Sequence, residues 1–311
     1  MKNYKYEVLV FLLGAIYMIL ELVCSRMLAP YFGTSNLVWT SVIGIVLLSS
    51  SLGNFIGGHI ADKDSSKKNI QLILACTAIS IFSIGIIQNF VLSNLSRTIS
   101  DIKLGAIIST IILFFLPSML IGFISPIAIK LRIQDLAKAG KTSGILYALS
   151  TLGSITGTFA GGFLLIPTLG SIEILYLLSL CICLLILSID IKNKVFVIFS
   201  LFFILLNGIW IYSITNTKNS SRDLVLNNQL GAVADYDTVY GRVNIINTYN
   251  KSGDFLRYLL IDKGAESSTY LEEGKEYELS AEYTRFYDLM FKSNIDIKES
   301  LMIGGARVLL S

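Results

Sequence analysis

Long apolar stretches follow one another along the first two thirds of the chain. Because an α-helix rises about 1.5 Å per residue, about 20 apolar residues are enough to cross a bilayer. The pattern predicts seven such spans, at residues 8–28, 38–61, 70–92, 104–129, 144–167, 171–189 and 195–214. The first span is too long for the apolar part of a cleaved signal peptide, and Glu21 and Arg26 stand where a cleavage site would be. We therefore expect this span to remain in the mature protein.

Small residues recur at four-residue spacing in the second and fifth predicted spans. The two ladders are Gly53, Gly57 and Gly58 in the second span, and Gly153, Gly157, Gly161 and Gly162 in the fifth. Such spacing lets the backbones of neighbouring helices approach closely. Any tightly packed bundle enriches glycine at helix contacts, so each ladder alone has a simple explanation. Their matched positions, one hundred residues apart, favour an internal repeat of three plus three spans.

The pattern changes after Asn216, where a polar linker at residues 217–222 leads into short strand-like segments. Residues 239–248 and 255–262 predict two strands around a turn at 250–253. Residues 276–291 have helical periodicity, and 300–303 predict a buried strand that enters a turn at Gly304 and Gly305. We thus predict a transmembrane helical domain at 1–216, a small β-hairpin domain at 217–275 and the start of another domain at 276–311.

Composition separates the same two parts. Hydrophobic residues make up 53% of the 311 residues, charged residues only 15%, and the mean hydropathy is +0.67. A soluble domain has about 25% charged residues, so an ordinary cytosolic protein is excluded. Of the 47 charged residues, 22 lie in residues 1–216 and 25 in the last 95. The expected organisation is a multi-pass part in the cell membrane followed by a water-soluble part.

Charge and cysteine usage exclude further classes of protein. The net charge of +3 divides into +6 for residues 1–216 and −3 for the rest, and the basic residues lie in loops, so no nucleic-acid partner is expected. The four cysteines lie within apolar stretches without a CxxC pair, and His59 is the single histidine. Neither a disulfide framework nor a metal site is expected. Membrane lipids are expected partners, and the oligomeric state is left open.

Basic residues are shared unequally between the two sides of the predicted spans. One side carries Lys2, Lys5, Lys63, Lys67, Lys68, Lys130, Arg132, Lys138, Lys141, Lys192 and Lys194, and the other carries Arg26, Arg97 and Lys103. The positive-inside rule places the N-terminus in the cytoplasm. Seven spans then place the tail outside.

The carboxylate of Glu21 lies inside the first span, five residues before Arg26. A charge in the hydrocarbon region is costly unless it faces a partner or a water-filled cavity. The spacing of five puts the two side chains on different helix faces, so a partner would come from another helix. Glu21 therefore marks either a structural ion pair or a solute pathway. Interfacial solvation explains Glu173, near the start of the sixth span.

A second charged segment ends the second span. Gly57-Gly58-His59-Ile60-Ala61-Asp62-Lys63 reads as a loop and resembles the loop between the second and third helices of the major facilitator superfamily. In that superfamily, charge pairs at this loop latch one transporter conformation. A solvated helix end carrying Asp62, Lys63 and Asp64 is the alternative.

The tail resembles the beginning of spermidine synthases, in which a small β-domain precedes a nucleotide-binding Rossmann-like domain. Four segments carry the resemblance in the family's order: Tyr240-Gly241-Arg242-Val243, Leu260-Ile261-Asp262-Lys263-Gly264, Tyr283-Thr284-Arg285-Phe286 and Leu301-Met302-Ile303-Gly304-Gly305. Residues 9–62, with Glu21, Ser25-Arg26, Leu28-Ala29-Pro30-Tyr31-Phe32-Gly33 and the glycines of the second span, are similar to the membrane half of fused transporter-like spermidine synthases. The resemblance makes residues 276–311 the start of a Rossmann-like α/β domain.

The resemblance implies transfer of an aminopropyl group from decarboxylated S-adenosylmethionine to a diamine such as putrescine. The nucleoside is a co-substrate, and no permanently bound cofactor is implied. Carboxylates and aromatic groups must hold the amine, and the matching positions are Tyr240, Asp262, Glu266 and Tyr283. Gly304 and Gly305 would let the backbone approach the nucleoside. Taken singly, the tyrosines are also explained as core residues and the acids as turn or surface residues.

Several positions depart from the family pattern. Gly241 and Glu266 stand where glutamine is usual, Lys263 separates an acid and a glycine that are normally adjacent, and Thr284 replaces a histidine. The sequence ends at Ser311, six residues after Gly305, before the family's ribose-binding acid and catalytic aspartate. We therefore assign no catalytic residue and expect a truncated enzyme domain without aminopropyltransferase activity. The alternative is a small-solute or polyamine transporter-like membrane module with a non-catalytic tail.

Overall fold

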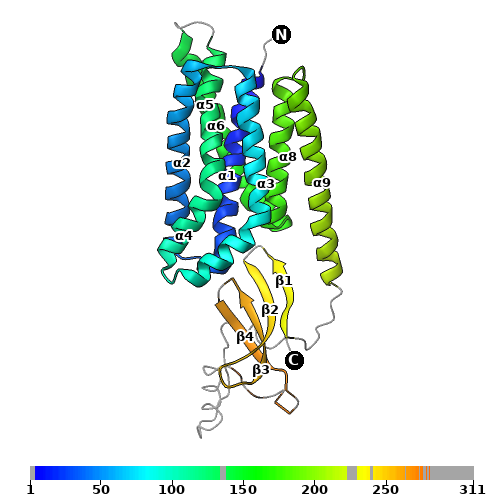
Figure 1. Cartoon of the computed structure of the whole chain (residues 1–311). Coiled ribbons are helices and arrows are strands. Elements are labelled where there is room, and N and C mark those ends of the chain that lie inside the picture. The colour runs from blue at the N-terminus through cyan, green and yellow to red at the C-terminus, as the bar shows by residue number, and fades with distance from the viewer. Residues whose placement is uncertain are drawn as a thin grey trace, which may run out of the picture. The chain divides into compact units, whose positions relative to one another are not determined.

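The computed structural model describes residues 4–133, 138–222, 230–238, 241–262, 264–272, 274–275, 278 and 280. The chain divides into two compact units, Met1–Lys218 and Asn219–Ser311. Figure 1 shows helices in the first unit and a β-sheet in the second.

The helical unit contains seven helical crossings in the described part of the chain, each long and apolar enough to cross a membrane. They are α1 (Lys5–Phe32), α2 (Asn36–Lys63), α3 (Lys67–Thr98), a fourth crossing built from α4 (Ile102–Thr110), η1 (Ile111–Phe115) and α5 (Leu116–Arg132), a fifth built from α6 (Ala139–Phe159), η3 (Ala160–Leu165) and α7 (Ile166–Thr168), then α8 (Ser171–Ile189) and α9 (Lys194–Arg222). The seven predicted spans are confirmed. Most of the helices extend a few residues beyond the apolar stretches, because polar residues at the helix ends continue the backbone hydrogen bonding.

The end of α2 corrects one prediction. The segment from Gly57 to Lys63 is not a loop, because α2 continues as a helix to Lys63. Ser66 then caps α3, its hydroxyl accepting a hydrogen bond from the Asn69 amide at 3.2 Å. The connection between the two helices is therefore only three residues long.

Two crossings contain a widened π-helical turn shortly before a proline. The segments η1 and η3 end two residues before Pro117 and Pro167. Proline donates no backbone hydrogen bond, and its ring clashes with the carbonyl group four residues earlier. A π turn accommodates this interruption without ending the crossing.

Glycines bring the helices together in two pairs. A Cβ atom on Gly57 of α2 would lie 2.6 Å from the Cα atom of Phe123 in α5. A Cβ atom on Gly153 of α6 would meet the carbonyl oxygen of Phe11 in α1, and one on Gly157 would meet the backbone of Ala15. The ladders predicted from the sequence are therefore helix contacts, α2 with α5 and α6 with α1.

The two pairs are related as an internal repeat. Gly14 in α1 meets the backbone of Ser150 and Ser154, and Gly122 in α5 meets the backbone of Ser50 and Asn54. Equivalent positions are thus 108 residues apart in the first and fourth crossings and 100 apart in the second and fifth. Repeats of three crossings run in opposite directions through a membrane, so the repeat is inverted.

Polar and aromatic groups join α3, α8 and α9. The Gln71 side chain of α3 donates to the carbonyl groups of Ile186 and Asp190 at the end of α8, at 3.1 and 2.9 Å. The Ser179 hydroxyl donates to the Ala78 carbonyl at 3.0 Å. Phe82 contacts rings on both neighbours, so α9 belongs to the helical core over its apolar length.

The second unit contains a four-stranded antiparallel sheet in the order β1 (Gly231–Asp237), β2 (Arg242–Tyr249), β3 (Phe255–Ile261), β4 (Gly264–Tyr270). The predicted hairpin is confirmed, with Tyr249 paired to Phe255. The side-chain oxygen of Asn250 closes the turn by accepting hydrogen bonds from the backbone amides of Ser252 and Asp254, both at 2.9 Å. The prediction of a hairpin alone was incomplete, because β1 pairs with the outer edge of β2 and β4 pairs with the outer edge of β3.

Sequence patterns do not mark the two flanking strands. Most of β4 consists of small and polar residues, and it is held by backbone pairing to β3. Of the helix predicted at 276–291, only Glu278 and Ser280 are described, and neither is helical. The strand predicted at 300–303 lies outside the described residues, as does the rest of that region.

A charged cluster ties the start of β3 to the residues after β4. The Lys275 ammonium group donates to Asp254 at 2.9 Å and forms an ion pair with Glu272 at 2.6 Å. The hydrogen bond from Lys275 lowers the pKa of Asp254 and that of Glu272, and the same contacts raise the pKa of Lys275. The cluster is therefore fully ionised at neutral pH.

Candidate functional site

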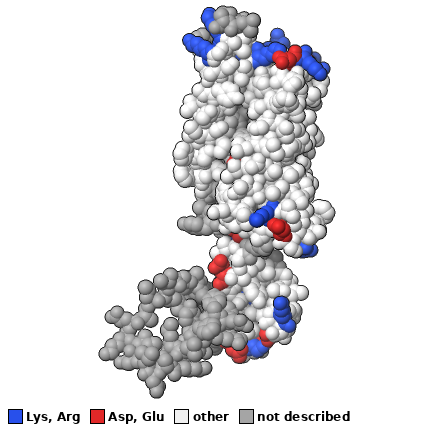
Figure 2. Space-filling model, turned by 90° about the vertical axis from the view of Figure 1, so that its left-hand side faces the viewer, with Lys and Arg blue, Asp and Glu red and all other residues white. Residues whose placement is uncertain are grey.

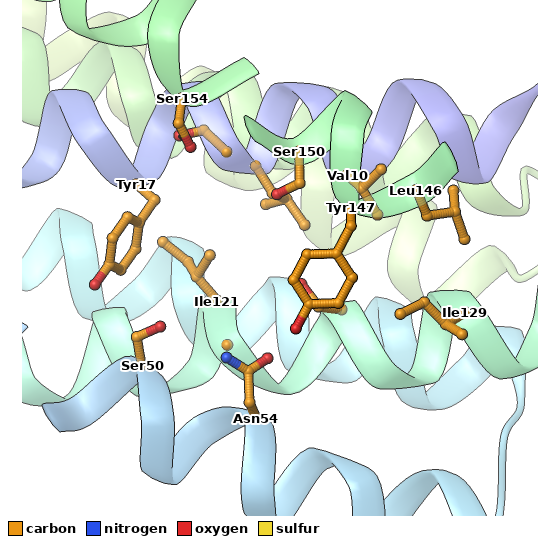
Figure 3. A pocket seen from close by; sticks show the side chains of 14 residues that line it. Val10, Tyr17, Ser50, Asn54, Ile121, Ile129, Leu146, Tyr147, Ser150 and Ser154 are labelled. Atoms are coloured by element: carbon orange, nitrogen blue, oxygen red, sulfur yellow. The ribbon is translucent and has the colours of Figure 1, made fainter. Parts of the chain in front are cut away.

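A pocket of about 150 Å³ lies in the helical unit, between the α1/α6 pair and the α2/α5 pair. It is lined by Val10, Leu13, Gly14 and Tyr17 of α1, Ser50 and Asn54 of α2, Ile121, Gly122, Ser125 and Ile129 of α5, and Leu146, Tyr147, Ser150 and Ser154 of α6. Figure 3 shows Asn54 and Tyr147 extending toward each other from α2 and α6. Half of these residues carry a polar side chain.

The repeat explains why these residues meet. The close contacts at Gly14 and Gly122 hold the helices of each pair together, and the neighbouring residues then face the space between the pairs. Equivalent positions line it from both sides: Leu13 with Ile121, Gly14 with Gly122, Tyr17 with Ser125, Ser50 with Ser150, and Asn54 with Ser154. The pocket therefore lies on the pseudo-two-fold axis of the repeat.

Two of the polar side chains are bonded to a neighbouring helix. The Tyr17 hydroxyl donates to the Val46 carbonyl of α2 at 2.9 Å and lies beside Ser50. The Ser154 hydroxyl donates to the Gly14 carbonyl of α1 at 3.3 Å. The first bond joins the two helix pairs to each other, and the second lies within the α1/α6 pair.

Four other polar side chains have no hydrogen-bond partner within the described chain: Asn54, Ser125, Tyr147 and Ser150. In hydrocarbon, a polar group without a partner costs several kcal/mol, so such groups face water, a ligand or another polar surface. Asn54 and Tyr147 are exposed, and Ser125 and Ser150 are partly buried, so their polar groups are open to water or to an occupant of the pocket. An amide, a phenol and two aliphatic hydroxyls can both donate and accept hydrogen bonds.

One end of the pocket is closed by apolar side chains. Val10, Ala128 and Leu146 are each at most 3% exposed and form a small cluster, here called the apolar plug, against which Ile129 packs. Beyond the plug, Arg132 of α5 forms an ion pair with Glu7 of α1 at 2.7 Å. This end of the unit is the one that carries the N-terminus.

A second ion pair lies at the same end. Lys130 of α5 bonds to Asp62 of α2 at 2.6 Å, with both side chains exposed. The basic side chains of the helical unit gather mainly at this end, and the face of the unit in Figure 2 carries few charges between its two ends. Both ion pairs therefore involve α5. One joins it to α2 and the other joins it to α1.

Glu21 lies one turn beyond Tyr17 on the same face of α1, at about 6 Å along the helix axis. It is partly buried. Among the residues that the structure describes, it forms neither a hydrogen bond nor an ion pair. The structural ion pair considered from the sequence is therefore absent from the described part of the chain.

No family model, curated protein or solved structure matches this chain.

The sheet unit holds two of the site residues expected from the sequence. Asp262 lies in the turn between β3 and β4 with a φ of 51°. Its side chain accepts a hydrogen bond from the Arg242 amide at 2.9 Å, and its own amide donates to the Arg242 carbonyl at 2.8 Å. Glu266 is exposed on β4, at the irregularity in its pairing with β3. Tyr240, Tyr283, Gly304 and Gly305 lie outside the described residues.

The pocket residues were not predicted from the sequence as a site. Serine and asparagine inside apolar spans have ordinary explanations, and no span shows which neighbour it packs against. A usable signal was present in the repeat, because Ser50 and Ser150 precede Gly53 and Gly153 at the same spacing. Ser50 and Ser150 are found when the two ladders are compared one helical turn further toward the N-terminus.

Proposed function

We propose that the helical unit is a transporter-like module of the cell membrane that binds a small polar solute between its two helix pairs. The observation that carries this proposal is the set of four pocket side chains without a partner in the described chain, Asn54, Ser125, Tyr147 and Ser150. A structural role would pair such groups with one another or with the backbone. Left unpaired within a membrane, they need water or another polar occupant, and a polar solute supplies the donors and acceptors that they lack.

The size of the pocket limits that occupant. A dry cavity of about 150 Å³ holds a molecule of benzene size, and this pocket has about that volume. Putrescine has as many non-hydrogen atoms as benzene and offers N–H donors to the hydroxyl and amide oxygens. The resemblance of the first two spans to transporter-like spermidine synthases supports the same class, a diamine or polyamine.

Binding of putrescine to the purified full chain tests this function. Replacing Asn54 with Leu or Ser150 with Ala removes an available polar group, and each loss should weaken binding about tenfold. Ser51→Ala is the matched control, because Ser51 is adjacent to Ser50 but does not line the pocket. Equal affinities for all four proteins, or no binding by the wild type, would contradict the proposal.

A second candidate function concerns the sheet unit. We infer that it corresponds to the small β-domain of an aminopropyltransferase, which transfers the aminopropyl group of decarboxylated S-adenosylmethionine to a diamine. The supporting observation is that Arg242 and Asp262, from two of the motifs that carry the resemblance, bond to each other through two hydrogen bonds. In this proposal Tyr240, Asp262, Glu266 and Tyr283 hold the amine, and Gly304 and Gly305 begin a Rossmann-like nucleoside site.

The coding sequence tests the enzyme proposal. Reading all frames beyond the codon for Ser311 should reveal a Rossmann-like segment with an acidic residue for the ribose and a catalytic aspartate. A downstream sequence without such a segment would contradict it and leave the solute-binding module. Incubating the purified chain with putrescine and decarboxylated S-adenosylmethionine then measures whether the residues present here are sufficient for turnover.

A further inference from the structure

The inverted repeat assigns a place to Glu21. Tyr17 and Ser125 are equivalent positions, 108 residues apart, and the same shift relates Glu21 to Ile129. Ile129 lines the plugged end of the pocket. Because the repeat is inverted, Glu21 occupies the matching position at the opposite end.

The repeat also brings a second polar group to that end. Val10 of the apolar plug is equivalent to Ser118 of α5 by the same shift. The Ser118 side chain is fully buried, and its hydroxyl oxygen has no hydrogen-bond partner within the described chain. Where the plugged end has Val10 and Ile129, the opposite end thus has a hydroxyl and a carboxylate.

The arrangement along α1 shows the same polarity. Glu7, Val10, Gly14, Tyr17 and Glu21 follow one another at alternating spacings of three and four, so they form one stripe on one helix face. The stripe is about 21 Å long. It begins at Glu7, whose carboxylate is paired with Arg132, and ends at Glu21, whose carboxylate has no partner in the described chain.

We propose that Glu21, assisted by Ser118, binds the cationic group of the solute at the end of the pocket opposite the apolar plug. An ionised carboxylate in a low-dielectric region is stable only beside a positive charge or water. A primary ammonium group supplies that charge and three N–H donors, which suit a carboxylate and a hydroxyl oxygen. The rest of the solute then extends toward Tyr17 and Asn54, so this inference rests on the function proposed above.

Discrimination between a charged and a neutral ligand measures this role. Putrescine and butanediol have the same number of non-hydrogen atoms but differ in charge, and their affinities for the full chain in lipid nanodiscs are measured by calorimetry. We expect the wild type to prefer putrescine by at least about tenfold. Glu21→Gln should reduce this preference to near unity, and Glu21→Asp should keep most of it.

Asp101→Asn is the matched control for charge. Asp101 lies at the same end of the helical unit and caps α4 through the Lys103 amide, a hydrogen bond that asparagine can also accept. This variant should keep the full preference for putrescine. Melting temperatures without ligand establish that each variant is folded.

The outcomes separate this inference from the proposed function. If Glu21→Gln keeps the wild-type preference while Asn54→Leu weakens both ligands, the pocket binds solute and the role of Glu21 is wrong. If neither ligand binds the wild type, the proposed function fails first.

Chemical modification gives a second readout that does not depend on affinity. A hydrophobic carbodiimide reacts with carboxyl groups inside membranes, and the adduct is located by mass spectrometry. Putrescine should protect Glu21 from modification, and butanediol should not. Equal modification with both ligands would overturn the proposal.

Discussion

The two helix pairs have the same backbone contacts but line the pocket with different side chains. Gly14 of α1 faces the backbone of Ser150 in α6, and Gly122 of α5 faces the backbone of Ser50 in α2. Glycine fixes the distance between backbones, and the geometry therefore repeats wherever the spacing repeats. The side chains one turn away are not constrained in this way. About two turns from the glycines, Ile129 of α5 lines the pocket, whereas the equivalent position in α1 is Glu21.

The largest effect should come from breaking the contact within either pair. In Gly57→Leu the side chain would collide with the backbone of Phe123, and in Gly157→Leu with that of Ala15. Backbone cannot move aside as a flexible side chain does, so each variant should lose about 3 kcal/mol of stability. Thermal unfolding in detergent measures the loss.

Each variant has a matched control at another glycine of the same ladder: Gly58→Leu for Gly57→Leu, and Gly162→Leu for Gly157→Leu. A Cβ atom at Gly58 or Gly162 would meet open space within 4 Å. Leucine at these two positions should leave the melting temperature nearly unchanged. A similar loss for all four variants, or none for any of them, would show that the ladders do not mark the contacts of the pairs.

A smaller effect should distinguish the two ion pairs at the plugged end. The Glu7 side chain is 14% exposed and its second carboxylate oxygen has no partner in the described chain. Arg132→Gln leaves this carboxylate without its counter-charge, which should cost about 2 kcal/mol. Lys130→Gln breaks the exposed pair with Asp62 and should have little effect. Equal shifts in melting temperature for the two variants would contradict this ranking.

The sheet unit provides a pH-dependent contrast. The pKa values of Asp254 and Glu272 are lower than the ordinary values of 3.8 and 4.5. The two ionised carboxylates therefore stabilise the sheet unit fully above the ordinary pKa values, and this stabilisation is lost as the pH falls through the lowered pKa values. The pKa of Lys275 is above its ordinary 10.5, so its contribution is lost as the pH rises through the raised value. Hydrogen exchange of β3 amides, corrected for the intrinsic rate, should show protection falling at both limits. Lys275→Met should remove the alkaline dependence and weaken the acidic one, because hydrogen bonds from Asn250 and from the Phe255 amide still lower the pKa values of Asp254 and Glu272. An unchanged profile would contradict the role of the cluster.

The sidedness of the two pocket ends can be tested without affecting stability. The charge distribution predicts that the plugged end faces the cytoplasm and that the sheet unit lies outside. After the four native thiols are removed, a cysteine at the exposed Ser252 of the β2–β3 turn is treated with an impermeant reagent. Labelling in intact cells is expected, and protection would refute the predicted orientation.

The sequence predicted the features that one segment determines by itself. Apolar stretches gave the seven crossings, and the turn at Asn250 gave the central hairpin, because both depend on local composition. The pocket depends on which helices are neighbours, and the pairing of α1 with α6 leaves no trace within either segment. The strand β4 was missed for a related reason, since its backbone pairing to β3 outweighs a sequence of small and polar residues. The roles of Asp262 and Glu266 stay predictions.

The apolar plug has a consequence for the membrane voltage. If the pocket is hydrated as far as Glu21, as the proposal requires, it extends the aqueous phase, and little of the transmembrane potential falls along it. Most of the potential then falls across the thin layer formed by Val10, Ala128 and Leu146. A cation at Glu21 would bind almost independently of voltage, whereas its passage through this layer would gain or lose about 2.3 kcal/mol per 100 mV. The direction of movement would therefore be decided at three apolar side chains.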